Sequence, residues 1–433
     1  MKKNRILAGA LALSFVLSCA CSKKKDSSDK EESTSSESVE VVSEESSEST
    51  AAPETTTEAT TTGTAESTTA ESESTTTSQG GSDSSVKKPS TFQSDKADTY
   101  IDSIKFDGVV LVAEGGQTVY TKAAGMADRD QDIPNTMDTV FELGSITKQF
   151  TAVAIMQLVE QGKLKLDDTL DKYIPEYKYA KDITIHQLLN MTSGVPDYIF
   201  CGVLGFTKDD FTNLSLSSFF SMQSLLSEVA VTPMEKDDLV RRISEYPMDF
   251  TPGTKCEYSN TNYYFLGIII EKLSGMAYDD YVRKNILEPL NLTHLFPDTD
   301  HLTSNGRTDF VLFHFDFPHQ HETLSYAVGV MTGTAEGLLE WERHVMDRDL
   351  TLISKESWDK IFEKGDFEYG YGWYLEDGYI EHSGMTLGYN ANVRVDPDSG
   401  KVIIVLCNIQ SLTTTPMRPL ASDVCDELWQ YFG

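Results

Sequence analysis

Residues 141–148 read Phe-Glu-Leu-Gly-Ser-Ile-Thr-Lys, and this stretch decides how the rest of the chain is interpreted. It places Ser145 and Lys148 at the start of an apolar, periodic segment over 146–160 that predicts a helix. Residues three apart share one helix face, so the Lys148 amine would lie beside the Ser145 hydroxyl. A serine hydroxyl is a poor nucleophile until a neighbouring base takes its proton. The stretch therefore predicts an activated serine at a helix start, where backbone N–H groups can also stabilise an oxyanion.

Two further short motifs follow along the chain, Tyr258-Ser259-Asn260 and His382-Ser383-Gly384. Ser-x-x-Lys alone is a weak signal, because it recurs in the polar N-terminal region and at Ser357. Tyr258, however, begins the only Tyr-x-Asn of the chain, and His382 begins the only His-x-Gly. The ordered set of three motifs is therefore far more specific than any one of its members.

Each motif supplies a group that acyl transfer requires. Tyr258 could act as a general base if Lys148 and a second cation lowered the pKa of its phenol, which is ordinarily about 10. Asn260 offers an amide that can bind a substrate carbonyl and Lys148. His382 could be the second cation or a hydrogen-bond donor near Tyr258.

The third motif also predicts how a substrate would be held. Gly384 would let the substrate lie against a strand edge, and Met385 would present a second backbone N–H to the oxyanion. Simpler interpretations are an N-cap at Ser145 with a solvated Lys148, a core aromatic at 258, a helix cap at 260 and a strand-end histidine bonded to the backbone at 382.

Strand signals lie at both ends of the folded part. Residues 106–113 and 118–123 flank a Gly-Gly turn, 370–376 and 379–382 flank an Asp-Gly turn, and 390–395 and 401–407 flank residues 396–400. We expect one antiparallel sheet built from the N- and C-terminal parts, closed by a helix over 417–431. The expected fold class is α+β, an α/β sandwich with a helix-flanked sheet and a mostly helical lobe.

Apolar periodicity near 3.6 residues predicts the helices of that lobe. Besides 146–160, they span 182–190, 219–228, 235–245, 262–273 and 278–290. Residues 199–235 have little turn punctuation, and we expect them to cover the site.

Residues 1–21 have the pattern of a lipoprotein signal peptide. A basic start precedes an apolar run, 6–17, that is too short to span a membrane. The run ends in Val-Leu-Ser-Cys-Ala-Cys, which is similar to a bacterial lipobox, with Cys19 as the expected lipidation site and Cys21 as the alternative. A plain cleaved signal peptide is the simpler interpretation. We expect an extracytoplasmic protein whose N-terminal lipid anchors it to the cell membrane.

Residues 22–90 consist almost wholly of Ser, Thr, Glu and Asp. Such a stretch cannot bury enough apolar surface to offset its ordering entropy, so we expect a disordered acidic stalk, followed by one folded domain over 91–433. The net charge of the chain is −32, and the folded part is acidic as well. This charge argues against a nucleic-acid partner.

The sequence implies no metal and no cofactor. The four cysteines of the folded part favour buried thiols over disulfides or a metal site. His314, His319 and His321 with Asp316 match no standard metal-ligand spacing, which favours a polar loop.

The ordered motifs resemble those of the serine β-lactamase and penicillin-binding protein superfamily, on the side of class C β-lactamases, DD-peptidases and related esterases. Residues 184–194, 250–254 and 369–373 resemble the segments around its motifs, with His186 in a structural role. The resemblance covers roughly 95–430 and implies a β-lactamase/transpeptidase-like fold. It also implies that Ser145 attacks a carbonyl, that Tyr258 and Lys148 move the proton, and that water cleaves the acyl-enzyme.

The third motif departs from most penicillin-interacting members, which carry Lys-Thr-Gly or Lys-Ser-Gly. Some DD-peptidases, D-amino-acid amidases and esterases resemble this chain in having histidine, which argues against efficient β-lactam hydrolysis. We expect a serine hydrolase, a DD-carboxypeptidase or D-amino-acid peptidase or amidase, acting near the cell wall on a small peptide such as a peptidoglycan stem peptide. The alternatives are an esterase acting on a small ester or a weak β-lactamase with the same site, and a catalytically silent cell-wall binding protein.

Overall fold

The computed structural model describes residues 91–205, 228, 231–310, 313–316, 321–365, 367–411 and 419–432. The expected signal peptide and stalk, most of the helix expected over 219–228, most of the cover expected over 199–235, and His319 lie outside these residues. Among the helices of the described ranges, none is both long and apolar enough to cross a lipid bilayer.

Strands and helices alternate irregularly along the described chain. The strands are β1 (Gly108–Glu114), β2 (Gln117–Ala124), β3 (Met126–Asp128), β4 (Ile133–Pro134), β5 (Phe141–Glu142), β6 (Leu295–Phe296), β7 (Arg307–Phe310), β8 (Phe313–Asp316), β9 (Thr332–Gly333), β10 (Tyr374–Leu375), β11 (Ile380–Thr386), β12 (Tyr389–Asp396), β13 (Lys401–Cys407) and β14 (Ile409–Ser411). The α-helices are α2 (Thr91–Ser103), α3 (Thr147–Glu160), α4 (Ile185–Leu189), α7 (Lys236–Ile243), α8 (Asn260–Ser274), α9 (Tyr278–Val282), α10 (Glu322–Gly329), α11 (Ala335–Met346), α12 (Lys355–Ile361) and α13 (Ala421–Trp429). Shorter 3-10 or π turns are η1 (Gly144–Ile146), η2 (Leu170–Lys172), η3 (Ala180–Asp182), η4 (Ile199–Leu204) and η5 (Arg283–Leu287).

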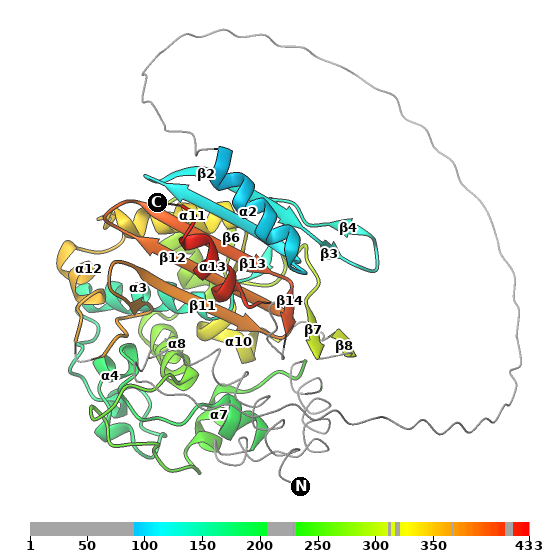
Figure 1. Ribbon diagram of the computed structural model, residues 1–433. Coiled ribbons are helices and arrows are strands. Elements are labelled where there is room, and N and C mark those ends of the chain that lie inside the picture. Colours follow the sequence, from blue (N-terminus) through cyan, green and yellow to red (C-terminus); the bar gives the residue numbers. More distant parts are fainter. Residues whose placement is uncertain are drawn as a thin grey trace, which may run out of the picture. The chain divides into compact units, whose positions relative to one another are not determined.

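The main sheet joins the two ends of the folded domain. Its strand order is β10-β11-β12-β13-β1-β2, and β1 pairs with β13 in antiparallel register, with Val110 opposite Val405. The predicted hairpin of β1 and β2 and the predicted strand pair β12 and β13 are therefore both present, side by side (Figure 1). This arrangement confirms the α+β fold class.

Both faces of this sheet are buried, each under a different hydrophobic core. Val109 and Leu111 of β1 face the larger core with α3 and α11, whereas Val110 and Val112 face the smaller core with α2 and α13. Figure 1 shows α2 and α13 lying across one side of the sheet. A strand covered on both faces needs no polar alternation, which explains the continuous apolar runs of β1 and β13.

The helical lobe contains most of the predicted helices. α8 includes the expected 262–273, α7 lies within 235–245, and α4 lies within 182–190. The segment expected over 278–290 is α9 followed by the π turn η5. The helices α2, α10, α11 and α12 were not predicted. Cys201, Cys407 and Cys425 are buried and Cys256 is half-buried, and all four are free thiols.

The strand expected over 370–376 is mostly wrong. Only Tyr374 and Leu375 are extended, and they pair with Glu381 and Ile380 of β11. Gly372 has φ 86°, and a side-chain Cβ there would lie 2.8 Å from the Lys148 carbonyl oxygen. The chain therefore turns at this glycine to pack against α3, and β10 covers only the beginning of the outer edge of β11.

Candidate active site

Ser145 lies in a tight turn between strand β5 and helix α3. Gly144 has φ 53°, a left-handed conformation that glycine adopts without steric cost, and it begins the turn η1. The Leu143 N–H donates to the Met331 carbonyl at 2.9 Å, which attaches the approach to the turn to a neighbouring segment. The serine is therefore presented by a rigid turn, two residues before α3 begins.

Lys148 is fully buried on the first turn of α3. Its Nζ donates to the Ser145 Oγ at 2.9 Å, the Asn260 Oδ1 at 2.9 Å and the Val328 carbonyl at 3.0 Å. An ammonium group has three donors, so these three acceptors satisfy it without water. The alternative of a solvated surface lysine is excluded, and the amine is directed at the serine oxygen.

Asn260 is the first residue of α8, and its amide is oriented by a carboxylate. The Asp197 Oδ2 accepts from the Asn260 backbone N–H at 2.7 Å and from its Nδ2 at 2.9 Å. This arrangement leaves Oδ1 directed at Lys148. The sequence did not single out Asp197, because no motif spacing relates it to Asn260.

Tyr258 lies beside the lysine at the edge of the site. The Lys148 Nζ is 5.0 Å from the centroid of its ring, and the ring is half-buried. The Tyr374 ring stacks at 6.5 Å on it, and the His382 ring lies at 6.2 Å. The structure thus brings Ser145, Lys148, Tyr258 and Asn260 into one cluster, as the motifs predicted.

Strand β11 packs directly against the serine turn. A Cβ at Gly384 would lie 1.9 Å from the Leu143 carbonyl oxygen and 3.2 Å from the Ser145 nitrogen. A Cβ at Gly144 would lie 2.6 Å from the Met385 nitrogen. Two glycines therefore allow the backbones to meet, with the N–H groups of Ser145 and Met385 near the same contact. Such a pair of N–H groups can stabilise an oxyanion on a carbonyl substrate.

His382 is buried behind this edge and is neutral. Its Nδ1 lies 2.6 Å from the Ser383 carbonyl oxygen, which requires Nδ1 to carry the proton, so its Nε2 accepts from the Tyr369 hydroxyl at 3.0 Å. Burial and the nearby Lys148 charge lower the pKa of His382 to about 3. The expectation of a second cation at this position is therefore corrected. The histidine bonded to the backbone, the simpler interpretation of the sequence, describes the geometry better.

His186 has a structural environment, as expected. Its Nδ1 lies 2.6 Å from the Tyr371 hydroxyl, and its Nε2 lies 3.2 Å from the Asn190 amide. It lines a polar cavity of about 320 Å³ together with Lys360 and Tyr369, among others. Tyr369 thus both lines this cavity and contacts His382.

The fold and the site together define a β-lactamase-related serine hydrolase. The profile of the Beta-lactamase family matches residues 95–421, and the chain belongs to this family. It is 30% identical over 332 residues to penicillin-binding protein 4* of Bacillus subtilis, an alignment covering 70% of this chain and 68% of that protein.

Solved structures agree with this assignment. A penicillin-binding protein from Bacillus halodurans is 25% identical with a TM-score of 0.63, over 78% of this chain and 100% of that one. The D-amino acid amidase of Ochrobactrum anthropi, with L-phenylalanine amide bound, is 18% identical with a TM-score of 0.62, over 78% and 97% of the two chains. At that identity the amidase shows a shared fold alone.

Proposed function

We propose that the protein hydrolyses amide bonds of small D-amino-acid peptides or amides through an acyl-enzyme on Ser145. The observation that carries the proposal is the fully buried Lys148, whose amine donates to the Ser145 Oγ at 2.9 Å. The general base is the neutral amine form of this lysine. The Ser145 hydroxyl then donates to Nζ, which takes the serine proton as the bond to a carbonyl carbon forms. A silent binding protein has no need for this arrangement.

The chemistry runs in two steps. The Ser145 Oγ attacks the substrate carbonyl, its proton passes to Lys148 with Tyr258 beside it, and the oxyanion accepts from the N–H groups of Ser145 and Met385. The proton then goes to the leaving amine, whose bond to the carbonyl carbon breaks. In the second step a water molecule gives up a proton to the same base and attacks the ester, which releases the acid and restores the serine.

The neutral His382 and the names of the relatives support the substrate class. With its two ring nitrogens engaged by Ser383 and Tyr369, His382 offers no positive charge to a substrate carboxylate. This favours amides and esters without a carboxylate next to the cleaved bond over β-lactams and over peptides with a free C-terminal carboxylate, both of which would benefit from a cation. Penicillin-binding proteins and a D-amino acid amidase are among the similar proteins, which agrees with a substrate containing a D-amino acid.

The location is a proposal from the sequence. The lipobox-like end of residues 1–21 and the acidic Ser/Thr-rich stretch over 22–90 would place the domain outside the cytoplasm, on a membrane anchor at Cys19 or Cys21. Peptidoglycan stem peptides would then be within reach.

The test follows intact protein mass and product release with four substrates. They are a peptide ending in D-alanyl-D-alanine, a D-amino-acid anilide, a nitrophenyl ester and penicillin. We expect turnover of the anilide, and slower turnover of the peptide, with a transient acyl adduct on Ser145 that Ser145→Ala abolishes without loss of thermal stability. Turnover of the ester alone would indicate an esterase, and penicillin consumption a β-lactamase. Undiminished hydrolysis by Ser145→Ala would disprove the nucleophile.

A further inference from the structure

A short chain segment, residues 326–331, runs along α3 and contacts the catalytic lysine through its backbone. The Ala327 carbonyl accepts from the Thr151 Oγ1 at 2.7 Å, and the next carbonyl, that of Val328, accepts from the Lys148 Nζ at 3.0 Å. Lys148 and Thr151 lie one turn apart on the same face of α3. The position of Lys148 therefore depends on how accurately this segment is placed.

Tyr326 begins the segment with an unusual backbone conformation. Its φ is 35° and its ψ is −142°, which interrupts α10. A tyrosine with positive φ is disfavoured sterically and persists only where surrounding contacts hold it. The interruption changes the direction of the chain immediately before the two carbonyls that face α3.

Aromatic and charged neighbours hold the Tyr326 side chain. The ring lies 5.0 Å from the Tyr264 ring and 5.4 Å from the Tyr278 ring, and the Lys236 Nζ lies 4.2 Å from its centroid. Burial, and after it the Glu271 carboxylate beside its hydroxyl, raises the pKa of Tyr326 well above its usual value. The ring is thus enclosed on several sides.

Helix α8 packs against Tyr326 and also carries Asn260, the amide partner of Lys148. Glu271 of α8 forms an ion pair with Lys236 at 2.5 Å and accepts from the Tyr278 N–H at 3.1 Å. One turn earlier, a Cβ at Gly267 would lie 2.5 Å from the Tyr326 Cε1 and 2.5 Å from the Ala327 Cβ. Glycine weakens a helix interior relative to alanine, so its presence here is explained by this close contact.

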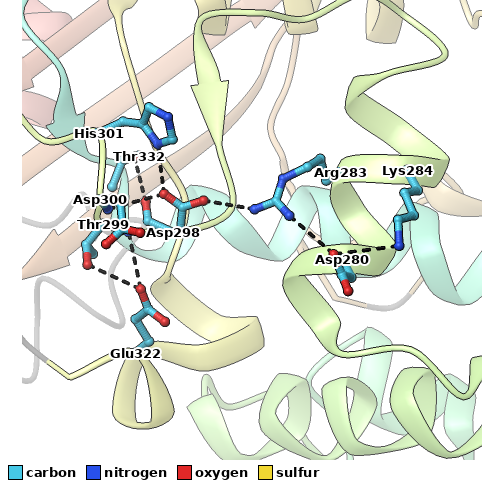
Figure 2. Close-up of polar contacts among 9 residues, drawn as sticks. All are labelled: Asp280, Arg283, Lys284, Asp298, Thr299, Asp300, His301, Glu322 and Thr332. Carbon is cyan, nitrogen blue, oxygen red and sulfur yellow. Dashed lines mark hydrogen bonds and ion pairs between the residues drawn. The ribbon is translucent and has the colours of Figure 1, made fainter.

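The loop 298–301 ties down both sides of the segment (Figure 2). Before it, the Thr299 Oγ1 donates to Glu322 at 3.4 Å, and after it the Thr332 Oγ1 donates to the Asp298 carbonyl at 2.8 Å. The Asp298 carboxylate is held in turn by the Arg283 guanidinium at 3.0 Å. Both flanks are therefore anchored, and the conformation at Tyr326 decides where the carbonyls between them point.

We propose that Tyr326 is a positioning residue that keeps the Val328 carbonyl on Lys148, and thereby keeps the amine directed at Ser145. The inference rests on the proposed function, in which Lys148 takes the serine proton. Tyr326 is not expected to touch Ser145 or a substrate bound at Gly384. Its neighbours fix the tyrosine ring, and the fixed ring in turn fixes the backbone that carries the Val328 carbonyl.

The test compares Tyr326→Leu with Tyr326→Phe and with Tyr177→Leu. The first removes the ring and the second restores it without the hydroxyl. Tyr177 is a buried tyrosine packed on Phe265, so its loss costs a similar aromatic core contact away from residues 326–331. Two quantities are measured on each folded protein: the rate at which a fluorophosphonate labels Ser145 as a function of pH, and the ¹⁵N–¹H signal of the Lys148 side chain. That signal is assigned by its loss in Lys148→Met.

We expect Tyr326→Leu to label about 10- to 100-fold more slowly, with a displaced pH midpoint and a shifted Lys148 signal. Tyr326→Phe should be labelled at a rate within about threefold of that of the parent protein. Tyr177→Leu should leave both the pH midpoint of labelling and the Lys148 signal unchanged. The proposal is overturned if Tyr326→Leu leaves both readouts unchanged, or if Tyr177→Leu moves them equally.

A second variant covers the case in which Tyr326→Leu does not fold. Gly267→Ala favours helix α8 but places a methyl group against Tyr326 and Ala327, so it should shift the same two readouts. Unchanged readouts in folded Gly267→Ala would also overturn the proposal. If the parent protein is not labelled at Ser145, the proposed function fails, whereas the Lys148 signal still decides the positioning role.

Discussion

Two buried basic side chains, Lys148 and His382, lie close together in this site and have different hydrogen-bond partners. Lys148 has three acceptors arranged around its amine. His382 is instead a neutral ring: its Nδ1–H donates to the Ser383 carbonyl, and its Nε2 accepts from the Tyr369 hydroxyl. Keeping His382 neutral limits the repulsion that a second cation would exert on Lys148.

The neutral state of His382 makes folding stability depend on pH. Its pKa is lowered to about 3 in the folded protein, whereas an unfolded histidine titrates near 6.5. Between these values the unfolded chain binds the extra proton, so stability is full above pH 6.5 and falls as the pH decreases. In the parent protein, His382 should make the free energy of unfolding about 2 kcal/mol lower at pH 4.5 than at pH 7. We expect His382→Gln to remove this contribution, as measured by urea unfolding at the two pH values.

The exposed His294 provides the control for that measurement. His294→Gln should retain the pH dependence of the parent protein, because its side chain is largely in solvent. If His382→Gln loses stability with acid as steeply as His294→Gln does, the neutral buried histidine is not the cause.

At this scale the sequence predicted the groups that carry chemistry but not those that orient them. Ser145, Lys148 and Asn260 belong to motifs with defined spacing, and the structure brings them together. Asp197 orients Asn260 from a separate loop, so no local pattern reports it. The Val328 carbonyl is a backbone group, and any residue type could supply it.

At the scale of elements, the junction between β11 and the serine turn is the closest contact in the site. The Gly384 position leaves no room for a methyl group against the Leu143 carbonyl. We expect Gly384→Ala to slow labelling of Ser145 by about 10²-fold or more and to destabilise the fold by about 1–3 kcal/mol, because β11, which carries the Met385 N–H, must move away from the serine turn.

The matched control for this change is Gly365→Ala. An added Cβ at Gly365 has no atom within 4 Å among the described residues. It should label at the rate of the parent protein within a factor of about two. Equal rates for Gly384→Ala and the parent protein would show that the junction is not as tight as described.

Helix α11 carries a buried acid that also couples folding to pH. Glu342 is fully buried, with the amide of Gln149 beside it, and burial raises its pKa to about 8. An unfolded glutamate titrates near 4.3, so the folded state binds the extra proton between these values and stability falls as the pH rises from about 4.3 to 8. We expect Glu342→Gln to stabilise the protein at pH 8 by about 2–4 kcal/mol and to have little effect at pH 4.

Urea unfolding at the two pH values would measure this, with Glu340→Gln on the same helix as the control. Glu340 is only half-buried, so its substitution should leave the slope unchanged. A Glu342→Gln slope equal to that of the parent protein would indicate that Glu342 is ionised in the fold.

Elements with strong local signals were predicted and weakly marked ones were missed. The glycine turns and apolar runs located β1, β2, β12 and β13, and the periodicity located α3 and α8. The strand expected over 370–376 failed because Gly372 turns the chain against α3, a contact with a segment far away in sequence. Helices such as α12 are short and are stabilised by packing, which composition does not reveal.

At the scale of the whole molecule, the sheet has a core on each face, and only the larger core adjoins the candidate active site. Changes in the smaller core should therefore alter stability without altering the reactivity of Ser145. Ile146 and Phe150, which neighbour Ser145 and Lys148 in the chain, belong to the larger core, whereas α13 closes the smaller one. We expect Leu428→Ala to lower the free energy of unfolding by about 2–5 kcal/mol, while the labelling rate of Ser145 in the folded protein changes less than twofold. Urea unfolding and labelling at 25 °C would measure both.

The exposed Gln430 next to α13 is the control for this change. Gln430→Ala should alter neither quantity. A large fall in the labelling rate of folded Leu428→Ala would mean that the two faces of the sheet are coupled.

Because β1 finds its partner β13 almost at the other end of the domain, the sheet is completed only after nearly the whole chain has been synthesised. The Gly384 edge is also made late, so a nascent chain would hold Ser145 without the strand that completes its site. On the proposed function, we therefore expect a nascent chain that lacks this strand to have no acyl-transfer activity. A protein that must remain unfolded until it has crossed a translocation channel would benefit from the same delay.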